Sequence, residues 1–172
     1  IAWQTRCPSI LKGVITTLID KNEDGDIEGF VLDLPGNRGT LDVYLLGNTV
    51  IFGENGFPAV WNDLEEGPVW VRGKLDSEGH FQATEVAIGD VLVLKGTVDS
   101  AVDEDDMFTL ALDPGQSVVD PTIPVTLSDK TLILVGCDNE VAKSAIKPGL
   151  PAQVAGKLSL DEQTLQAIAI FL

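Results

Sequence analysis

The sequence predicts an all-β protein made of two copies of one small β-barrel unit joined in tandem. Three observations support this prediction. Short segments recur along the chain at a nearly constant offset, apolar and β-branched residues gather in strand-length runs, and glycine and proline separate these runs. Helical periodicity is weak, and residues 139–146 are the stretch that we expect to form a helical turn.

The internal repeat is the strongest of these signals. Lys12-Gly13 recurs as Lys95-Gly96, 83 positions later, and Gly73-Lys74-Leu75 recurs at the same offset as Gly156-Lys157-Leu158. Two further matches follow in the same order: Thr49-Val50-Ile51 with Thr131-Leu132-Ile133, and Phe81-Gln82-Ala83 with Leu165-Gln166-Ala167. A series of matches in one order indicates an internal duplication.

The repeat also predicts the domain boundaries. We expect a lead-in segment over residues 1–10, a first barrel over 11–89 and a second barrel over 90–172. About five strands in roughly 80 residues are too few for two stacked sheets, so each unit is expected to close on itself as an OB-like barrel. The recurrent glycines are expected where strands bend or bulge.

A series of strand and turn motifs covers nearly the whole chain from about Leu11. The motifs resemble those of exported bacterial proteins of unknown function that are built from tandem OB-like repeats. The resemblance rests on Gly13 to Ile15, Gly29 to Leu32, Thr49 to Ile51 and Leu64 to Leu75, with a looser copy from Ile146 to Leu158. It implies a tandem OB-like fold and an exported protein, and it supplies no catalytic residues.

The charge of the chain is strongly acidic. The 27 acidic and 11 basic residues give a net charge of −16. Such a surface repels phosphate backbones and anionic lipid headgroups, so we predict no nucleic-acid partner. No apolar run approaches the ~20 residues of a spanning helix, so we predict no membrane insertion. Cations or a basic protein are the expected partners.

The best candidate site is an acidic loop that begins at Asp20. Oxygen-bearing side chains at alternate positions, followed by a glycine, form the opening of a calcium-binding loop, because the glycine permits the turn that directs the oxygens inward. We predict a Ca²⁺ site with ligands drawn from Asp20, Asn22, Asp24, Asp26 and Glu28. The alternative is a solvated acidic turn in which Asp24-Gly25 supplies hairpin geometry. The bidentate acid of an EF-hand is missing, since its position holds Val31.

Trp61 is the candidate ligand-binding aromatic residue. It follows the segment Gly56-Phe57-Pro58-Ala59-Val60, which has the composition of an exposed loop. An indole exposed there would offer a stacking surface to a sugar ring. The alternative is that Trp61 packs against the barrel, because aromatic side chains carry a large apolar area.

No constellation of catalytic residues is visible in the sequence. The single histidine, His80, has no second imidazole beside it, and neither cysteine has a neighbouring base. No serine lies in a nucleophile elbow, and no glycine loop suits a phosphate. We therefore predict that the protein is not an enzyme and has no catalytic or cofactor-binding residues apart from the possible Ca²⁺ ligands.

The two cysteines fit no metal-binding spacing. Cys7 lies in the lead-in segment and Cys137 lies in the second repeat. One interpretation is a long-range disulfide between them, which requires an oxidising compartment. The other is two unrelated free thiols. The disulfide would agree with an exported protein.

Two functions follow from these observations. The first is a non-catalytic exported structural subunit that associates with itself or with a cell-surface protein complex, using the lead-in segment and the apolar strand over residues 167–172 to extend a neighbour's sheet. The second is a monomeric binding module, extracellular or periplasmic, for a small ligand or carbohydrate. It would use the loop from Asp20 and the Trp61 loop.

Overall fold

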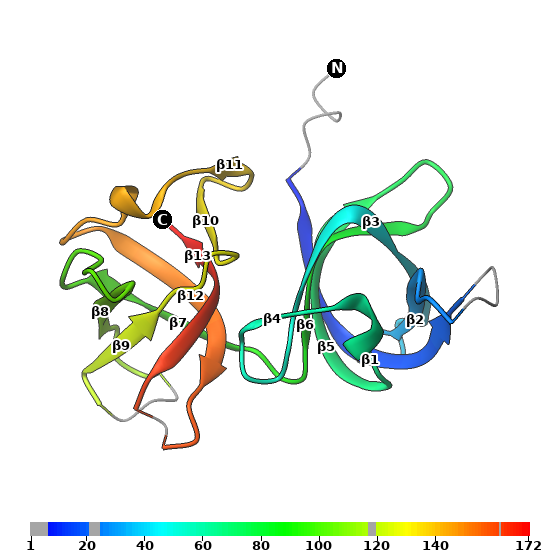
Figure 1. The fold of residues 1–172 in the computed structure, drawn as a ribbon, viewed down its shortest axis with the longest axis horizontal. Helices are drawn as coiled ribbons and strands as arrows, with labels where there is room; N and C mark the ends of the chain where they lie inside the picture. Colours follow the sequence, from blue (N-terminus) through cyan, green and yellow to red (C-terminus); the bar gives the residue numbers. More distant parts are fainter. Residues whose placement is uncertain (1–6, 21–24, 117–119, 162) are drawn as a thin grey trace. The chain divides into compact units, whose positions relative to one another are not determined.

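The computed structural model describes residues 7–20, 25–116, 120–161 and 163–172. The chain divides into two compact units, Ile1–Glu54 with Pro58–Asp90 and Asn55–Phe57 with Val91–Leu172. Each unit contains one closed five-stranded barrel, so the predicted all-β fold of two tandem OB-like barrels is confirmed (Figure 1). We call them the first barrel and the second barrel.

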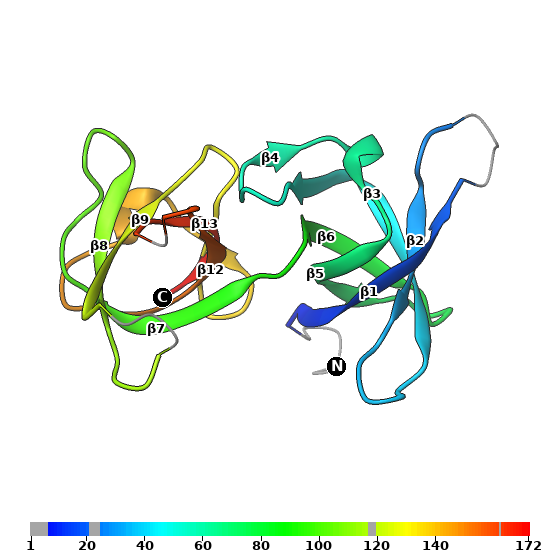
Figure 2. The same cartoon turned by 90° about the horizontal axis from the view of Figure 1, so that it is seen from below.

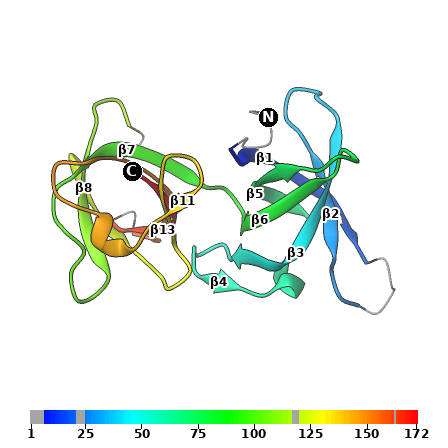
Figure 3. The same cartoon turned by 90° about the horizontal axis from the view of Figure 1, so that it is seen from above.

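The first barrel is closed by a parallel pair of strands. β1 pairs with β2 and β5, β5 pairs with β6, and β2 pairs with β3, all antiparallel. β3 and β6 then pair in parallel, so β3 runs between β6 and β2 (Figure 3). Its elements are β1 (Ser9–Ile19), β2 (Gly29–Asp33), β3 (Thr40–Phe52), β4 (Pro58–Ala59), the 3₁₀ helix η2 (Trp61–Asp63), β5 (Gly67–Leu75) and β6 (Phe81–Ile88).

The second barrel has the same topology. β7 pairs with β8 and β12, β8 pairs with β9, and β12 pairs with β13, all antiparallel. β9 and β10 both pair in parallel with β13, so together they take the place of the long β3, and the strands form a ring (Figure 2). Its elements are β7 (Leu92–Val98), β8 (Met107–Leu112), β9 (Thr122–Thr126), β10 (Leu132–Val135), β11 (Asn139–Glu140), the 3₁₀ helix η3 (Lys143–Ala145), β12 (Pro151–Leu158) and β13 (Leu165–Phe171).

The helical turn expected within residues 139–146 is present as η3, but it is a single 3₁₀ turn preceded by the short strand β11. The first barrel has a helical turn in the corresponding place, η2, which includes Trp61. No helical period is visible in the sequence there, because a three-residue turn is too short to show one.

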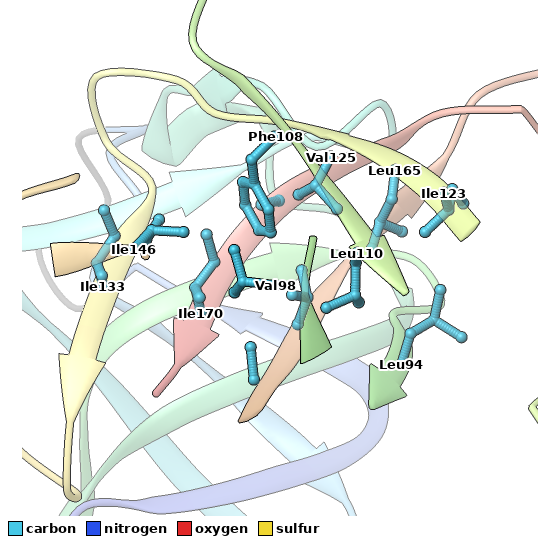
Figure 4. Packing of buried hydrophobic residues seen from close by; sticks show 13 residues of the cluster. Leu94, Val98, Phe108, Leu110, Ile123, Val125, Ile133, Ile146, Leu165 and Ile170 are labelled. Atoms are coloured by element: carbon cyan, nitrogen blue, oxygen red, sulfur yellow. The ribbon is translucent and has the colours of Figure 1, made fainter. Parts of the chain in front are cut away.

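Alternating residues of the strands fill the interior of each barrel. In the second barrel, Val98 of β7, Phe108 and Leu110 of β8 and Ile170 of β13 meet in one buried cluster (Figure 4). The first barrel is filled in the same way by residues that include Phe30, Val43, Val71 and Phe81. Burying a side chain of this size contributes about 1.5–3 kcal/mol, so these clusters are the main source of stability of each barrel.

A buried threonine closes each barrel at the same point. In the first barrel the Thr49 hydroxyl donates to the Ala83 carbonyl oxygen at 2.6 Å and accepts from the Leu46 amide. In the second, the Thr131 hydroxyl donates to the Ala167 carbonyl oxygen at 2.8 Å and accepts from the Ser128 amide. The sequence repeat matches Thr49 with Thr131. The two hydroxyl groups make equivalent hydrogen bonds, so the two residues have the same structural role in their barrels.

The recurrent glycines mark the bulges that the repeat predicts. The strand register shifts between Arg72 and Gly73 in β5, and between Ala155 and Gly156 in β12. A Cβ atom on Gly73 would lie 2.1 Å from the carbonyl oxygen of the neighbouring strand, and one on Gly156 would lie 2.4 Å away. Only glycine permits this close approach of two backbones.

The ends of the repeat differ from the expected boundaries. β1 begins at Ser9, which pairs with Gly73, so the last two residues of the predicted lead-in segment belong to the first barrel. At the other end, β13 pairs with β12 on one side and with β9 and β10 on the other. The apolar strand over residues 167–172 is therefore part of its own barrel, which is the reason for its apolar composition on both faces.

Candidate functional site

The predicted calcium loop lies between β1 and β2. Asn22 and Asp24 lie outside the described residues, whereas Asp20, Asp26 and Glu28 lie within them. The Asp20 carboxylate accepts a hydrogen bond from the Gly25 amide, with 2.7 Å between Oδ2 and N, and Gly25 has a φ of 86°. Asp20 therefore shapes the turn, and the glycine supplies the left-handed conformation that the turn requires.

The other carboxylate oxygen of Asp20 is buried and has no hydrogen-bond partner among the residues that the structure describes. A buried carboxylate oxygen without a partner is costly, and a bound cation or water is one way to satisfy it. Among the described residues, however, no group of three or more histidine, cysteine, aspartate or glutamate side chains is arranged to hold a metal ion. The calcium site stays a prediction, and the hydrogen bond to Gly25 agrees equally with a solvated turn.

The corresponding acidic loop of the second barrel is built differently. The Asp103 carboxylate accepts hydrogen bonds from the amides of Asp105 and Met107, at 2.9 and 3.0 Å. The Asp106 carboxylate forms an ion pair of 2.5 Å with Lys143 of η3. These carboxylates hold the loop between β7 and β8 in place.

Trp61 is half-buried at the start of η2 and packs against the core of the first barrel. Its indole N–H donates to the carbonyl oxygen of Thr49 at 3.3 Å. The neighbouring Asn62 accepts a weak hydrogen bond of 3.4 Å from the amide of Ile27, so the Trp61 turn and the loop from Asp20 do meet. The structure thus brings together the two loops of the predicted ligand site, with the indole used for packing.

A second set of polar and aromatic residues lies on the outer face of β2, β3 and β6. Val43 of β3 faces the core, so Tyr44 faces outward. Tyr44 pairs with Gly29 on one side and with Gln82 on the other. A Cβ atom on Gly29 would lie 3.2 Å from Cδ1 of the Tyr44 ring, so the missing side chain leaves room for this ring.

The turn between β5 and β6 borders this face and is organised by Asp76. One oxygen of Asp76 accepts hydrogen bonds from the amides of Glu78 and His80, both at 2.9 Å. The other oxygen accepts from Nε2 of Gln82, also at 2.9 Å. The hydrogen bond from Gln82, together with the one from the His80 amide, holds the pKa of the Asp76 carboxyl below its ordinary value.

His80 contacts the tyrosine of this face. The His80 and Tyr44 rings meet edge to face, with centroids 5.0 Å apart and an interplanar angle of 72°. Nδ1 of His80 lies 3.8 Å from the Asp76 carboxylate and 3.7 Å from that of Glu78. We define the Tyr44 face as Gly29, Tyr44, Asp76, His80 and Gln82. It offers an aromatic ring beside an amide, an imidazole and a carboxylate.

Sequence reasoning missed the Tyr44 face. No motif in the sequence singles out Tyr44, and the sequence shows no second imidazole beside His80. The two are brought together by the parallel pairing of β3 with β6, whose register partners are 35 to 38 positions apart in the sequence. The one signal in the sequence was Asp76 followed by Glu78-Gly79-His80, a turn whose aspartate can accept several amides.

The second barrel lacks the aromatic part of this face. Thr126 takes the place of Tyr44 beside Gln166, and its hydroxyl forms a hydrogen bond of 2.5 Å with Oε1 of Gln166. In the turn between β12 and β13, the Ser159 hydroxyl donates to the Asp161 carboxylate and lowers the pKa of that carboxyl. The two barrels therefore share a fold and differ in what their outer faces offer.

Neither cysteine of the chain is a free thiol. The specific pairing of Cys7 with Cys137 stays a prediction, which peptide mapping of the unreduced protein would check. Among the described residues, no helix has the length and apolar composition needed to cross a membrane.

Comparison with known proteins shows no family for this chain. No protein-family model matches the chain, and no curated protein sequence matches it significantly. One similar solved structure is the crystal structure of a deletion mutant of the single-stranded DNA binding protein from Thermus aquaticus. It is 14% identical, the match covers 95% of this chain and 94% of that chain, and the TM-score is 0.26.

This match contradicts the prediction that nucleic acid is excluded as a partner. The exclusion rested on the net charge, which is a sum over the whole chain and does not fix the charge of any one face. We withdraw the exclusion. With a TM-score of 0.26, the match also carries no argument that this chain binds DNA. The family to which the chain belongs therefore stays open, and its two OB-like barrels stand on their own topology.

Proposed function

We propose that the protein is a non-catalytic, exported binding module whose first barrel binds a neutral carbohydrate on the Tyr44 face. The observation that carries the proposal is the half-exposed Tyr44 ring, set between Gly29 and Gln82 and edged by His80. An exposed aromatic ring can stack on the apolar face of a pyranose. The face across strands 2 and 3 and the adjoining loops is also where OB barrels take oligosaccharides and oligonucleotides.

The polar groups around the ring favour hydroxyl groups over anions. Gln82 and His80 can each donate or accept hydrogen bonds, and the Asp76 carboxylate accepts them. Asp76 and Glu78 both lie within 4 Å of the His80 ring nitrogen, which makes the border of the face acidic.

The structural role predicted from the terminal segments has less support. Its apolar strand is β13, and both edges of β13 are already paired within the second barrel. A strand with two paired edges has no backbone groups left to extend a neighbouring sheet. The binding module is therefore the better supported of the two functions.

The test begins with a glycan array, in millimolar calcium and after chelation, because the loop from Asp20 remains a predicted calcium site. The best glycan is then titrated by calorimetry into the native protein and two variants. We expect Tyr44→Ala to weaken binding about tenfold, equivalent to about 1.4 kcal/mol, because it removes the stacking surface. Tyr44→Phe keeps the ring and should bind nearly as well.

Thr126→Ala is the matched control, since it alters the corresponding position of the second barrel. An array on which no neutral glycan binds would refute the proposed function. Equal affinities of the native protein and Tyr44→Ala for the glycan would show that Tyr44 is not part of the binding site.

A further inference from the structure

A groove of about 330 Å³ lies on the outer face of the second barrel. Its lining includes Lys95, Asp113, Gln153 and Phe171. Small-molecule sites in proteins commonly have volumes of about 300–1,000 Å³, so the groove is at the small end of this range. It lies on β7, β12 and β13, whereas the Tyr44 face lies on β2, β3 and β6 of the first barrel.

Three of the lining residues form one row across the sheet. Gln153 of β12 is the register partner of both Lys95 in β7 and Phe171 in β13. Register partners point to the same side of a sheet. Ala152 and Val154 belong to the buried core, so this row points outward. An ammonium group, an amide and an aromatic ring are thus placed side by side on the surface.

The first barrel has a different row at the corresponding position. There, Trp70 is the register partner of Lys12 and Ala87. Trp70 is only 1% exposed. In the second barrel the bulky indole is replaced by Gln153 in β12, and the aromatic ring moves to Phe171 in β13. This exchange puts a polar amide at the centre of the row.

The charges of the groove point to a neutral ligand. Lys95 supplies one positive group and Asp113 one negative group, so the lining has no net charge. A polyhydroxylated ring would accept hydrogen bonds from Lys95, donate them to Asp113, exchange them with Gln153 and stack on Phe171.

We propose that this groove is a second carbohydrate site, which takes a single neutral pyranose ring. The inference rests on the proposed function for its ligand class, but it uses different residues in the other barrel. Two sites on one chain would let a long or branched glycan bind with greater avidity than either site gives alone.

The test is a titration of the whole chain with D-glucose, D-galactose and N-acetyl-D-glucosamine, followed by the backbone amide signals in NMR spectra. We expect at least one sugar to shift the signals of Lys95, Gln153 and Phe171. Gln153→Ala should reduce these shifts at a given sugar concentration by at least half. If Gln153→Ala is poorly folded, Phe171→Leu takes its place and should reduce the shifts by the same amount. Gln163→Ala, in the exposed turn between β12 and β13, is the matched control.

The two proposals fail separately in this experiment. Shifts confined to the first barrel would overturn the groove and leave the Tyr44 face in place. Shifts confined to the groove would overturn the Tyr44 face and leave the groove in place. The Tyr44→Ala variant should leave the sugar-induced shifts of the groove signals unchanged. If none of the three sugars shifts the groove signals, or if Gln153→Ala and Phe171→Leu leave the shifts intact, the second site is wrong.

Discussion

The two barrels keep the same closing contacts and differ on their outer faces. Thr49 and Thr131 make equivalent hydrogen bonds to the last strand of their barrels. In contrast, Arg72 and Glu85 form a buried ion pair of 2.5 Å across β5 and β6, where the second barrel has the register pair Ala155 and Ala169. The repeat has therefore kept the residues that close a barrel and has varied outward-pointing residues of β5 and β6 against those of β12 and β13.

The largest expected effect comes from breaking the buried ion pair. Both side chains are less than 10% exposed, so Glu85→Ala removes the carboxylate that faces the buried Arg72 guanidinium, whose NH1 also contacts the Thr84 hydroxyl at 3.3 Å. We expect a loss of about 3 kcal/mol or more in the free energy of unfolding, measured with urea. The double variant Arg72→Ala, Glu85→Ala copies the second barrel and should lose less.

Hydrogen exchange followed strand by strand locates this effect. Protection should fall in β5 and β6 and should change little in β12 and β13, where Ala155→Val serves as a comparison at the corresponding position. If the double variant is as unstable as Glu85→Ala alone, the loss comes from removed packing and the two outer faces are not interchangeable.

A smaller effect, equal in both barrels, is expected at the bulge glycines. Gly73→Ala and Gly156→Ala would each place a methyl group within 2.4 Å of a backbone carbonyl oxygen, at a cost of about 1–3 kcal/mol. Gly47→Ala is the control, because Gly47 also lies in a strand and has no atom within 4 Å of the added Cβ. Urea unfolding of the three variants checks the prediction. A Gly73→Ala variant as stable as Gly47→Ala would contradict the shared bulge.

The smallest expected effect is a difference between the Asp76 turn and the Asp161 turn in how they respond to pH. Asp76 has a pKa below its ordinary value in the folded protein, mainly through Gln82, so its ordering of the turn is fully present above the ordinary aspartate pKa. It is lost as the pH falls through the lowered pKa. The amide signals of Glu78 and His80 should therefore move in acid together with the side-chain amide of Gln82.

Asp161 provides the comparison, because its pKa is also lowered but its hydrogen bonds come from Ser159 and Gln163 within its own turn. Acid should weaken glycan binding on the Tyr44 face through Asp76, and Asp76→Asn should remove this dependence. Asp161→Asn should leave it unchanged. A pH dependence that survives Asp76→Asn would show that another group is responsible.

The sequence predicted the parts of the fold that depend on local pattern. The repeat aligned Thr49 with Thr131 and Gly73 with Gly156, because these positions must satisfy the same hydrogen bonds and close contacts in each barrel. The segment Asp76-Ser77-Glu78-Gly79 also has the composition of a turn.

The candidate site was less predictable, because its contacts join segments that are distant in sequence. The approach of His80 to Tyr44 depends on the parallel register of β3 with β6. The row of Lys95, Gln153 and Phe171 depends on three strands that are separated by whole loops. Trp61 illustrates the same difficulty, since only the packing of η2 shows that its indole N–H is used by Thr49.

The most direct test of the binding function is the affinity of the Tyr44→Ala variant for the best neutral glycan, measured by calorimetry beside the native protein and Thr126→Ala. The account predicts affinity about tenfold weaker for Tyr44→Ala and unchanged affinity for Thr126→Ala. Unchanged affinity of Tyr44→Ala would contradict a ligand site on the Tyr44 face. An equal loss of affinity in Tyr44→Ala and Thr126→Ala would contradict a site that belongs to the first barrel alone.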